Sequence, residues 1–368
     1  MKVIDFIKEY GVAALKEQLF INVKEYDDLI VLNYDQINSP KAHSVVMECR
    51  GLILDKHTLD VVCRGFDRFF NIGECPETQQ GLDLKECSVY EKVDGSLIKI
   101  YNYKDKWHIS TSGTAFAESE VNGFGITFKE LVLKVIDMSD EQFQQALSCV
   151  DEHLTFICEV VSFENRVVKA YAEPALYLLA ARWRDECNGM YSICSEDWFK
   201  NIPHKLPKKY DFGSIEDCVD ASKELKDLDE GYVVYDKYGV PRCKIKSPAY
   251  LAVHRIKGNC LTPKRIMELV LINEQDEYLT YFQEHKQMFE PYISAYVNMM
   301  IDTALFFHEV CGIENQKEFA MKVKDHLCSS VLFKARRDNI SVAKAFQSQS
   351  DSYKMSVLEK RVAEDKCK

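Results

Sequence analysis

The sequence lacks the features that identify several common classes of protein. Its 14 cysteines form no C-x-x-C pair and no zinc-finger spacing, and its 9 histidines are scattered without the spacing of metal ligands. No hydrophobic segment is long enough to span a bilayer, and we expect no secretion signal. These absences predict a cytoplasmic protein with reduced thiols, no zinc site and no membrane partner.

Signatures of two other kinds of active site are also missing. There is no glycine-rich Walker A loop, so any phosphate group would have to be bound by lysine and arginine side chains. No Ser-His-Asp or Cys-His arrangement is supported. The net charge is −11, which means that a nucleic acid could be held only by a local basic groove.

The most informative stretch that is present runs from Tyr90 to Ser96. It places Lys92 in an apolar, strand-like segment and follows it with Asp94 and Gly95. An uncharged lysine amine can attack phosphorus and hold the product as a phosphoramidate, which is covalent catalysis. Alone, the tetrad Lys-x-Asp-Gly is weak, because about one chain in ten of this length would contain it by accident.

Further motifs surround this run in a definite order. They are Glu48-Cys49-Arg50-Gly51, Arg68-Phe69-Phe70-Asn71, residues 156–160 around Glu159, Asn165-Arg166, residues 230–234 beginning with Glu230, and Lys244-Ile245-Lys246-Ser247 with Tyr250 and His254. The series resembles the covalent nucleotidyltransferase superfamily of polynucleotide ligases and capping enzymes. Within it, the chain resembles the bacteriophage T4 RNA ligase 1 family over roughly residues 30–310, mainly in the first 255.

The resemblance implies roles for these positions. Lys92 would be the nucleophile that becomes lysyl-AMP, and Lys244 and Lys246 would act with it on the α-phosphate as catalytic groups. The residues expected to bind ATP are Tyr34, Arg50, Arg68, Phe70, Glu91, Lys92, Glu159, Lys244 and Lys246. The residues expected to bind Mg²⁺, or Mn²⁺ in its place, are Asp94, Glu159, Glu230, Asp276 and Glu277.

Some of these roles also follow from elementary chemistry, with alternatives left open. Lys244 and Lys246 are two residues apart, so on a strand both side chains leave the same face, where they could meet a triphosphate or simply be solvated. We expect burial and these cations to lower the pKa of Lys92. Asp94 with Gly95 could equally be an ordinary turn, although we expect the glycine to let the backbone approach the ligand. Phe70 could equally be a core residue.

The sequence departs from the family pattern at three places. Arg68 stands where the family usually has lysine, and a guanidinium can still bind phosphate. Ser110 and Ser112 stand where a family member has lysines, so contacts that depend on those lysines are in doubt. The pair formed by Asp276 and Glu277 matches poorly and could be an exposed acidic pair on a helix.

Periodicity predicts an α+β protein with an antiparallel core. By resemblance, residues 1–255 would form a nucleotidyltransferase domain with ATP-grasp-like antiparallel sheets, and residues 256–368 an all-helical domain for RNA specificity. The expected helices are 1–20, 126–149 and those within 263–311. The expected strands are 29–32, 51–54, two or more within 88–112 joined by a turn at 102–106, then 154–161, 176–181 and 232–235.

The resulting hypothesis is an ATP-dependent RNA ligase. It would join RNA 5′-phosphate and 3′-hydroxyl ends through lysyl-AMP and RNA-adenylate, mend cleaved tRNA anticodon loops as a monomer, and work in the host cytoplasm if a phage encodes it. The alternatives are a DNA ligase or capping-type enzyme, and a non-catalytic relative that only binds nucleotide or tRNA. A DNA ligase or capping enzyme would be expected to carry an oligonucleotide-binding barrel after Lys246, where the sequence predicts helices instead.

Overall fold

The protein divides into two compact units. The computed structural model describes residues 1–79, 82, 84–184, 191–192, 196–257, 261–273 and 275–366. The first unit is Met1–His254 and the second is Arg255–Lys368, a division that falls next to the predicted one. Within the described ranges, no helix combines the length and apolar character that crossing a membrane requires.

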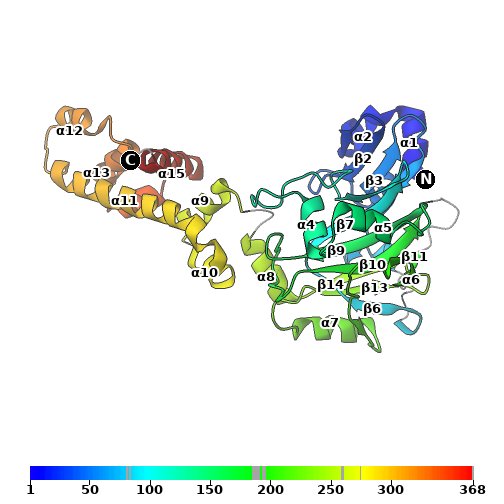
Figure 1. The fold of residues 1–368 in the computed structure, drawn as a ribbon. Helices are drawn as coiled ribbons and strands as arrows, with labels where there is room; N and C mark the ends of the chain where they lie inside the picture. Colours follow the sequence, from blue (N-terminus) through cyan, green and yellow to red (C-terminus); the bar gives the residue numbers. More distant parts are fainter. Residues whose placement is uncertain are drawn as a thin grey trace. The chain divides into compact units, whose positions relative to one another are not determined.

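Three sheets form the framework of the first unit (Figure 1). The first has the order β1-β2-β3-β4, with β1 (Ile21–Glu25), β2 (Leu29–Tyr34), β3 (Arg50–Asp55) and β4 (Val61–Cys63). The second has the order β11-β10-β9-β7-β8, with β7 (Ser96–Tyr103), β8 (Lys106–Ser110), β9 (Leu154–Val161), β10 (Ala175–Trp183) and β11 (Tyr191–Ser192). The third has the order β12-β6-β13-β14-β5, with β5 (Phe70–Asn71), β6 (Ser88–Glu91), β12 (Lys209–Tyr210), β13 (Gly231–Tyr235) and β14 (Pro241–Lys246). Neighbouring strands in these sheets are antiparallel except β14 and β5, which are parallel.

Short helices cover the sheets. They are α1 (Lys2–Tyr10), α2 (Val12–Leu19), α3 (Ser44–Glu48), η1 (Pro76–Gln79), η2 (Leu84–Glu86), α4 (Phe128–Val135), α5 (Asp140–Ala146), α6 (Glu196–Phe199), α7 (Ile215–Lys223) and α8 (Pro248–Lys257). In Figure 1, α1 and α2 lie against the first sheet and α7 against the third. The α+β prediction is confirmed.

Two of the predicted helices are each split in two. The expected helix 1–20 breaks at Gly11, which has φ 81° and separates α1 from α2. The expected helix 126–149 breaks at Asp137, with φ 52°, after which Ser139 starts α5 with a capping box. A residue with left-handed backbone ends a helix. The helical spacing of apolar residues continues across both breaks, so the sequence pattern does not reveal them.

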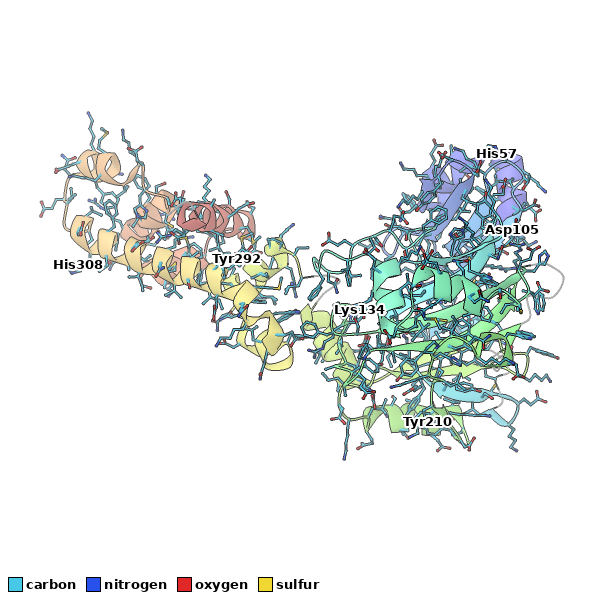
Figure 2. The ribbon with its side chains drawn as sticks, in the orientation of Figure 1. His57, Asp105, Lys134, Tyr210, Tyr292 and His308 are labelled. Atoms are coloured by element: carbon cyan, nitrogen blue, oxygen red, sulfur yellow. The ribbon has the colours of Figure 1, made fainter. Side chains whose placement is uncertain are left out.

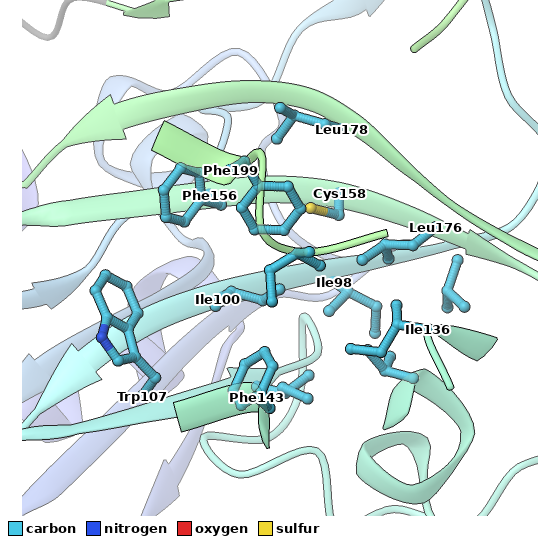
Figure 3. Packing of buried hydrophobic residues seen from close by; sticks show 14 of the residues in the cluster. Ile98, Ile100, Trp107, Ile136, Phe143, Phe156, Cys158, Leu176, Leu178 and Phe199 are labelled. Atoms are coloured by element: carbon cyan, nitrogen blue, oxygen red, sulfur yellow. The ribbon is translucent and has the colours of Figure 1, made fainter. Parts of the chain in front are cut away.

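The alternation of side chains along β9 determines where the active-site groups can lie. Phe156 and Cys158 point into a core that also contains residues of α4 and α5 (Figure 3). Ile157 points the other way, into a core shared with Val233 of β13. Because side chains alternate along a strand, Glu159 faces the same way as Ile157, toward the third sheet.

The second unit is helical in all of its described regular structure. Its helices are α9 (Pro263–Leu271), α10 (Gln275–Tyr281), η3 (Gln283–His285), α11 (Lys286–Val310), α12 (Gln316–Val323), α13 (Ser329–Asp338), α14 (Val342–Gln347) and α15 (Asp351–Lys366). One of its cores joins Val310 at the end of α11 to Phe319, Val323 and Leu332. The helical character predicted for this part of the chain is confirmed.

Candidate active site

Many of the predicted site residues converge on one region of the first unit. Lys244 interacts electrostatically with Arg50, Arg68, Lys92 and Lys246. These cations come from β3, the segment before β5, the end of β6 and β14, so chain segments far apart in sequence supply them. The side chains of Lys244 and Lys246 leave the same face of β14, as predicted, while Cys243 and Ile245 face the core beneath.

A single buried carboxylate joins two of the lysines. Glu230 is 4% exposed, and its Oε2 lies 2.7 Å from Lys92 Nζ while its Oε1 lies 2.8 Å from Lys246 Nζ. The strands fix this geometry, because Lys92 donates its backbone N–H to Gly231 O at 2.8 Å and Gly231 is paired with Lys246. Glu230 therefore holds the predicted nucleophile and one of its neighbouring cations in a fixed arrangement.

Glycine is required at the turn after Lys92 for a reason that the sequence did not indicate. A Cβ on Gly95 would lie 2.3 Å from Val160 O, and the Gly95 N–H donates to Glu159 Oε1 at 3.2 Å. Packing against β9 thus requires glycine here, and the expectation that this glycine lets the backbone approach a ligand stays a prediction. Its close contact with β9 brings the nucleophile turn next to Glu159.

Asp94 is satisfied by donors from the protein itself. Its Oδ2 accepts the N–H groups of Val168 and Lys169 at 2.8 and 2.7 Å, and its Oδ1 accepts the Tyr250 hydroxyl at 2.7 Å. The carboxylate therefore ties the turn to a later loop and to α8. This geometry favours a structural role for Asp94 over the predicted contact with a metal.

The pKa pattern of the lysines differs from the predicted one. Burial lowers the pKa of Lys92, but Glu230 and Glu159 outweigh it, so the net shift in the free protein is upward. The expectation of a lowered pKa for Lys92 is therefore wrong in its net direction, because a carboxylate is in direct contact with the amine. Lys244 is the lysine affected in that way: burial, with Arg50, Lys92 and the other cations, lowers its pKa to about 6.

Glu159 is a carboxyl group in a buried position. Burial raises its pKa to about 7, and the negative charge of Glu230 adds to this, although Lys92 and Arg50 act in the opposite direction. The pKa of Glu230 is instead held low, because Lys92 and Lys246 outweigh its burial. A divalent cation near Glu159 would stabilise its ionised form.

The predicted ATP contacts Tyr34 and Phe70 surround Arg68. Arg68 donates to the Tyr34 hydroxyl at 2.8 Å and to Glu74 Oε1 at 3.0 Å. Its guanidinium lies 4.9 Å from the Tyr34 ring centre and 5.0 Å from that of Phe70. All three predicted residues are at least 92% buried. The burial of Phe70 favours the core alternative, and Glu74 is a partner that the motifs did not identify.

Phe69, which the motif reasoning passed over, is the ring next to two of the phosphate-binding candidates. The Lys244 amine lies 4.5 Å from its centre and the Arg50 guanidinium 5.3 Å. Phe70 lies next to Arg68 instead, so the two adjacent rings contact different cations. Arg50 also has a buried Nη1 without a hydrogen-bond partner among the described atoms. A buried donor of this kind is suited to an anionic oxygen.

The two serine departures are accompanied by a lysine that motif reasoning missed. Ser110 is fully buried on β8 and pairs with Lys99 of β7, which is also fully buried. The Lys99 amine donates to Gly51 O, next to Arg50. Burial lowers the pKa of Lys99. A cross-strand tether from β7 to β3 thus lies beside the position where the sequence lacks the family lysines.

The remaining predicted residues lie elsewhere or are only partly described. The Glu91 carboxylate accepts the backbone N–H of Lys208 at 3.0 Å and lines a small cavity that Lys92 also lines. Asp276 is exposed on α10 of the second unit, and the side chain of Glu277 lies outside the described residues. A metal role for this pair stays a prediction.

Among the described side chains, no group of three or more His, Cys, Asp or Glu residues could form a metal cage. Mg²⁺ commonly binds one or two carboxylates together with waters and substrate phosphates. Glu159, whose buried carboxyl interacts unfavourably with Glu230, fits that mode of binding. The residues present therefore fit a hydrated Mg²⁺ that arrives with a nucleotide.

Comparison with known proteins supplies the family. The sequence matches the family model described as RNA ligase over residues 48–250, which is more than half of the chain. It is 37% identical over 366 residues to a putative bifunctional polynucleotide kinase/RNA ligase of Autographa californica nuclear polyhedrosis virus, covering 95% of this chain and 51% of that protein. It is 27% identical over 290 residues to an RNA ligase of Rhodothermus phage RM378, covering 63% of this chain and 65% of that one.

Solved structures give a weaker likeness. An archaeal ATP-dependent RNA ligase has a TM-score of 0.46 at 13% identity, over 95% of this chain and 82% of that one. The Naegleria gruberi RNA ligase with pyrophosphate has a TM-score of 0.38 at 17% identity, over 51% and 57%. The family assignment rests on the sequence match alone. The chain spans only about half to two thirds of the length of the viral and phage relatives that it matches.

Proposed function

Because the chain belongs to the RNA ligase family, we propose that it is an ATP-dependent RNA ligase that works through a lysyl-AMP intermediate on Lys92. One observation carries the proposal: the Lys92 amine is held by a buried glutamate whose other oxygen binds Lys246. Arg50 and Lys244 lie in the same electrostatic cluster. An amine next to gathered cations is what attack on a bound triphosphate requires.

In the first step, Lys92 Nζ forms a bond to the α-phosphorus of ATP, the bond to the bridging oxygen breaks, and pyrophosphate leaves. The amine must lose its proton to solvent before it attacks, and Glu230 Oε2, 2.7 Å away, holds it in position. Lys246 would stabilise the charge that develops on the α-phosphate oxygens. Lys244, whose pKa is about 6 in the free protein, would join it because a bound phosphate favours the charged amine. Arg50, with its unpartnered Nη1, would bind an outer phosphate. Bound Mg²⁺, held near Glu159, would offset the negative charge of the triphosphate.

Two further steps complete the joining of RNA. AMP passes from Lys92 to an RNA 5′-phosphate, which restores the free amine and forms RNA-adenylate. An RNA 3′-hydroxyl then attacks that 5′-phosphate, forms the phosphodiester and releases AMP. The finer proposal that the RNA is a cleaved tRNA anticodon loop, repaired by a monomer, is supported by the family resemblance alone.

The helical second unit favours an RNA ligase over a DNA ligase or capping enzyme. After Lys246, every described element of regular structure is a helix, whereas those enzymes would be expected to carry a barrel of strands. The retained set of Lys92, Glu230 and Lys246, with its paired geometry, counts against a relative that only binds RNA, because such a protein needs no nucleophile.

The test is covalent labelling. Incubation with Mg²⁺ and ATP labelled at the α-phosphate should leave labelled AMP on the wild-type protein and none on Lys92→Ala, while the exposed-lysine control Lys106→Ala should label normally. Labelling that persists in Lys92→Ala would refute the assignment of the nucleophile. Labelling by GTP in place of ATP would favour a capping enzyme.

A joining assay then tests the substrate. Single-stranded RNA, a nicked RNA stem-loop and a nicked DNA duplex should be offered side by side with unlabelled ATP. We expect sealing of RNA and preference for the nicked stem-loop. Equal sealing of the DNA nick would contradict the RNA assignment, and preference for single-stranded RNA would contradict tRNA repair.

A further inference from the structure

Two phenylalanine side chains form an exposed pair in the first unit. Phe124 is 49% exposed and Phe163 is 61% exposed. Their ring centres are 5.9 Å apart and the rings meet edge to face at 75°. Neither residue is used by the chemistry proposed above.

The backbone around both rings is held in place. Phe163 lies in the turn in which Ser162 donates to Asn165 Oδ1 at 2.9 Å. Phe124 lies in the loop whose Asn122 amide donates to Glu164 O at 2.9 Å, so one turn is bonded to the other. Lys134 of α4, labelled in Figure 2, adds an ion pair to Glu164 at 2.6 Å. The two turns that carry the rings are therefore joined to each other.

These joined turns are fastened to the candidate active site. The Asn165 amide donates to Val160 O at 2.8 Å and to Ser96 Oγ at 3.0 Å. Val160 follows Glu159, and Ser96 follows Gly95 in the nucleophile turn. Phe163 is four residues after Glu159, so their Cα atoms are at most about 14 Å apart. The platform lies within a short reach of the place where RNA ends would be joined.

The chemistry of the pair suits a nucleobase. Exposed aromatic rings beside a nucleic-acid site stack on bases, and they tolerate any sequence because every base has a π-face. If a phenylalanine offers roughly 200 Å² of surface, the two rings expose together about 200 Å². A protein partner usually covers about 800 Å² on each side. The neighbouring Glu120, Asn122 and Lys134 are polar.

We propose that Phe124 and Phe163 form a stacking platform for an unpaired base at the end of the RNA substrate. The inference rests on the proposed function for its substrate class, and it adds a residue pair that would hold RNA without acting on ATP. A base stacked there would orient the strand that enters the site, and it would be read by its ring face and not by its identity.

The experiment uses the full chain and compares the wild type with Phe124→Ala, Phe163→Ala and the double variant. The control is Phe20→Ala, which changes another exposed phenylalanine of the same unit. Fluorescence anisotropy with a short 5′-phosphorylated single-stranded RNA measures binding, and covalent labelling with ATP measures the first step. Because stacking accounts for about 5- to 150-fold in affinity per base, the double variant should bind RNA that much more weakly. Labelling by ATP and the unfolding midpoint should match those of the wild type.

Two substitutions at one position separate stacking from other apolar contacts. Phe163→Trp keeps an aromatic face and should bind like the wild type, whereas Phe163→Leu keeps apolar surface without that face and should resemble Phe163→Ala. Binding of the double variant within twofold of the wild type would overturn the proposal. So would full binding by Phe163→Leu, or a change in oligomeric state, which would indicate a protein contact.

The anisotropy measurement does not depend on ligase activity. If the wild type binds RNA through the two rings but acquires no AMP on Lys92, the proposed function fails and the stacking platform stands. If AMP is acquired and RNA binding ignores both rings, the platform fails and the proposed function stands.

Discussion

Glu230→Gln is the substitution that most directly tests how the site is held together. The glutamine keeps the size of the side chain but removes the charge that both ammonium groups share. Lys92 and Lys246 would then lie next to an amide, with side chains only 21% and 22% exposed. Removing one partner of a buried ion pair costs about 3–5 kcal/mol, because the remaining charge is left without compensation. Since both lysines keep some contact with water, we expect the lower end, about 3 kcal/mol.

Urea unfolding followed by tryptophan fluorescence measures this loss in the first unit. The chain has 3 tryptophans, Trp107, Trp183 and Trp198, all of them before residue 255. The matched control is Glu25→Gln, since Glu25 pairs with Lys56 on the surface, where the two side chains are 57% and 39% exposed. Surface pairs contribute less than about 1 kcal/mol. A loss in Glu230→Gln no larger than that of the control would refute the bridging role.

The pH dependence gives an independent check with a definite sign. The pKa of Glu230 is lowered in the folded protein from an ordinary value of 4.5. Its charge therefore stabilises the fold above pH 4.5, and this contribution is lost as pH falls from there through the folded-state pKa. The difference in unfolding free energy between wild type and Glu230→Gln should be full at neutral pH and should shrink in acid. A difference that grows in acid would contradict the assignment.

Three further predictions concern other parts of the site. Gly95→Ala places a methyl group 2.3 Å from a carbonyl oxygen of β9. It should lower the unfolding free energy by about 1–3 kcal/mol in the same urea assay and reduce AMP labelling. The control Gly113→Ala, whose added methyl group would have nothing within 4 Å, should change the unfolding free energy by less than about 0.5 kcal/mol. Because the pKa of Lys244 is about 6, its amine is cationic below that pH. Calorimetry should therefore show that sulfate binds the free protein more tightly at pH 5 than at pH 7, and Lys244→Arg should flatten this change. An unchanged pH dependence in the variant would exclude Lys244 as the group responsible. Tyr250→Phe removes the hydroxyl that donates to Asp94 at 2.7 Å and should lower the urea-unfolding free energy by about 1.5–3 kcal/mol, the value of a hydrogen bond to a charged group; a loss under about 0.5 kcal/mol would mean that water replaces it.

The sequence predicted the site as a set of positions, and in large part the fold brings those positions together. The order of motifs around Lys92 was informative because each motif combined a charged residue with a strand-like apolar setting. The spacing of Lys244 and Lys246 was enough to place both on one face, since alternation along a strand is a local property. No comparable evidence in the sequence supported a metal role of the exposed Asp276, because an acidic pair on a helix surface is common.

Other features could not be predicted, because they depend on pairs of residues far apart in the chain. The pKa of Lys92 follows from contact with Glu230, 138 residues later. The order of the motifs does not reveal whether the charge nearest to the Lys92 amine is negative or positive. The structural role of Asp94 follows from donors at residues 168, 169 and 250. The exposed pair of Phe124 and Phe163 was missed for the same reason, since neither ring is unusual in its own segment.

The sequence by itself determined the strands of the central motifs, the order of the charged motifs and the change to helices after β14, because periodicity and residue type act over short distances. It did not indicate β1 or the short strands β4, β5, β11 and β12. Tertiary structure alone decided which carboxylate contacts which lysine, why glycine is needed beside β9, and that Tyr34 and Phe70 surround an arginine. These outcomes depend on how three sheets pack, and packing fixes distances that no linear spacing contains.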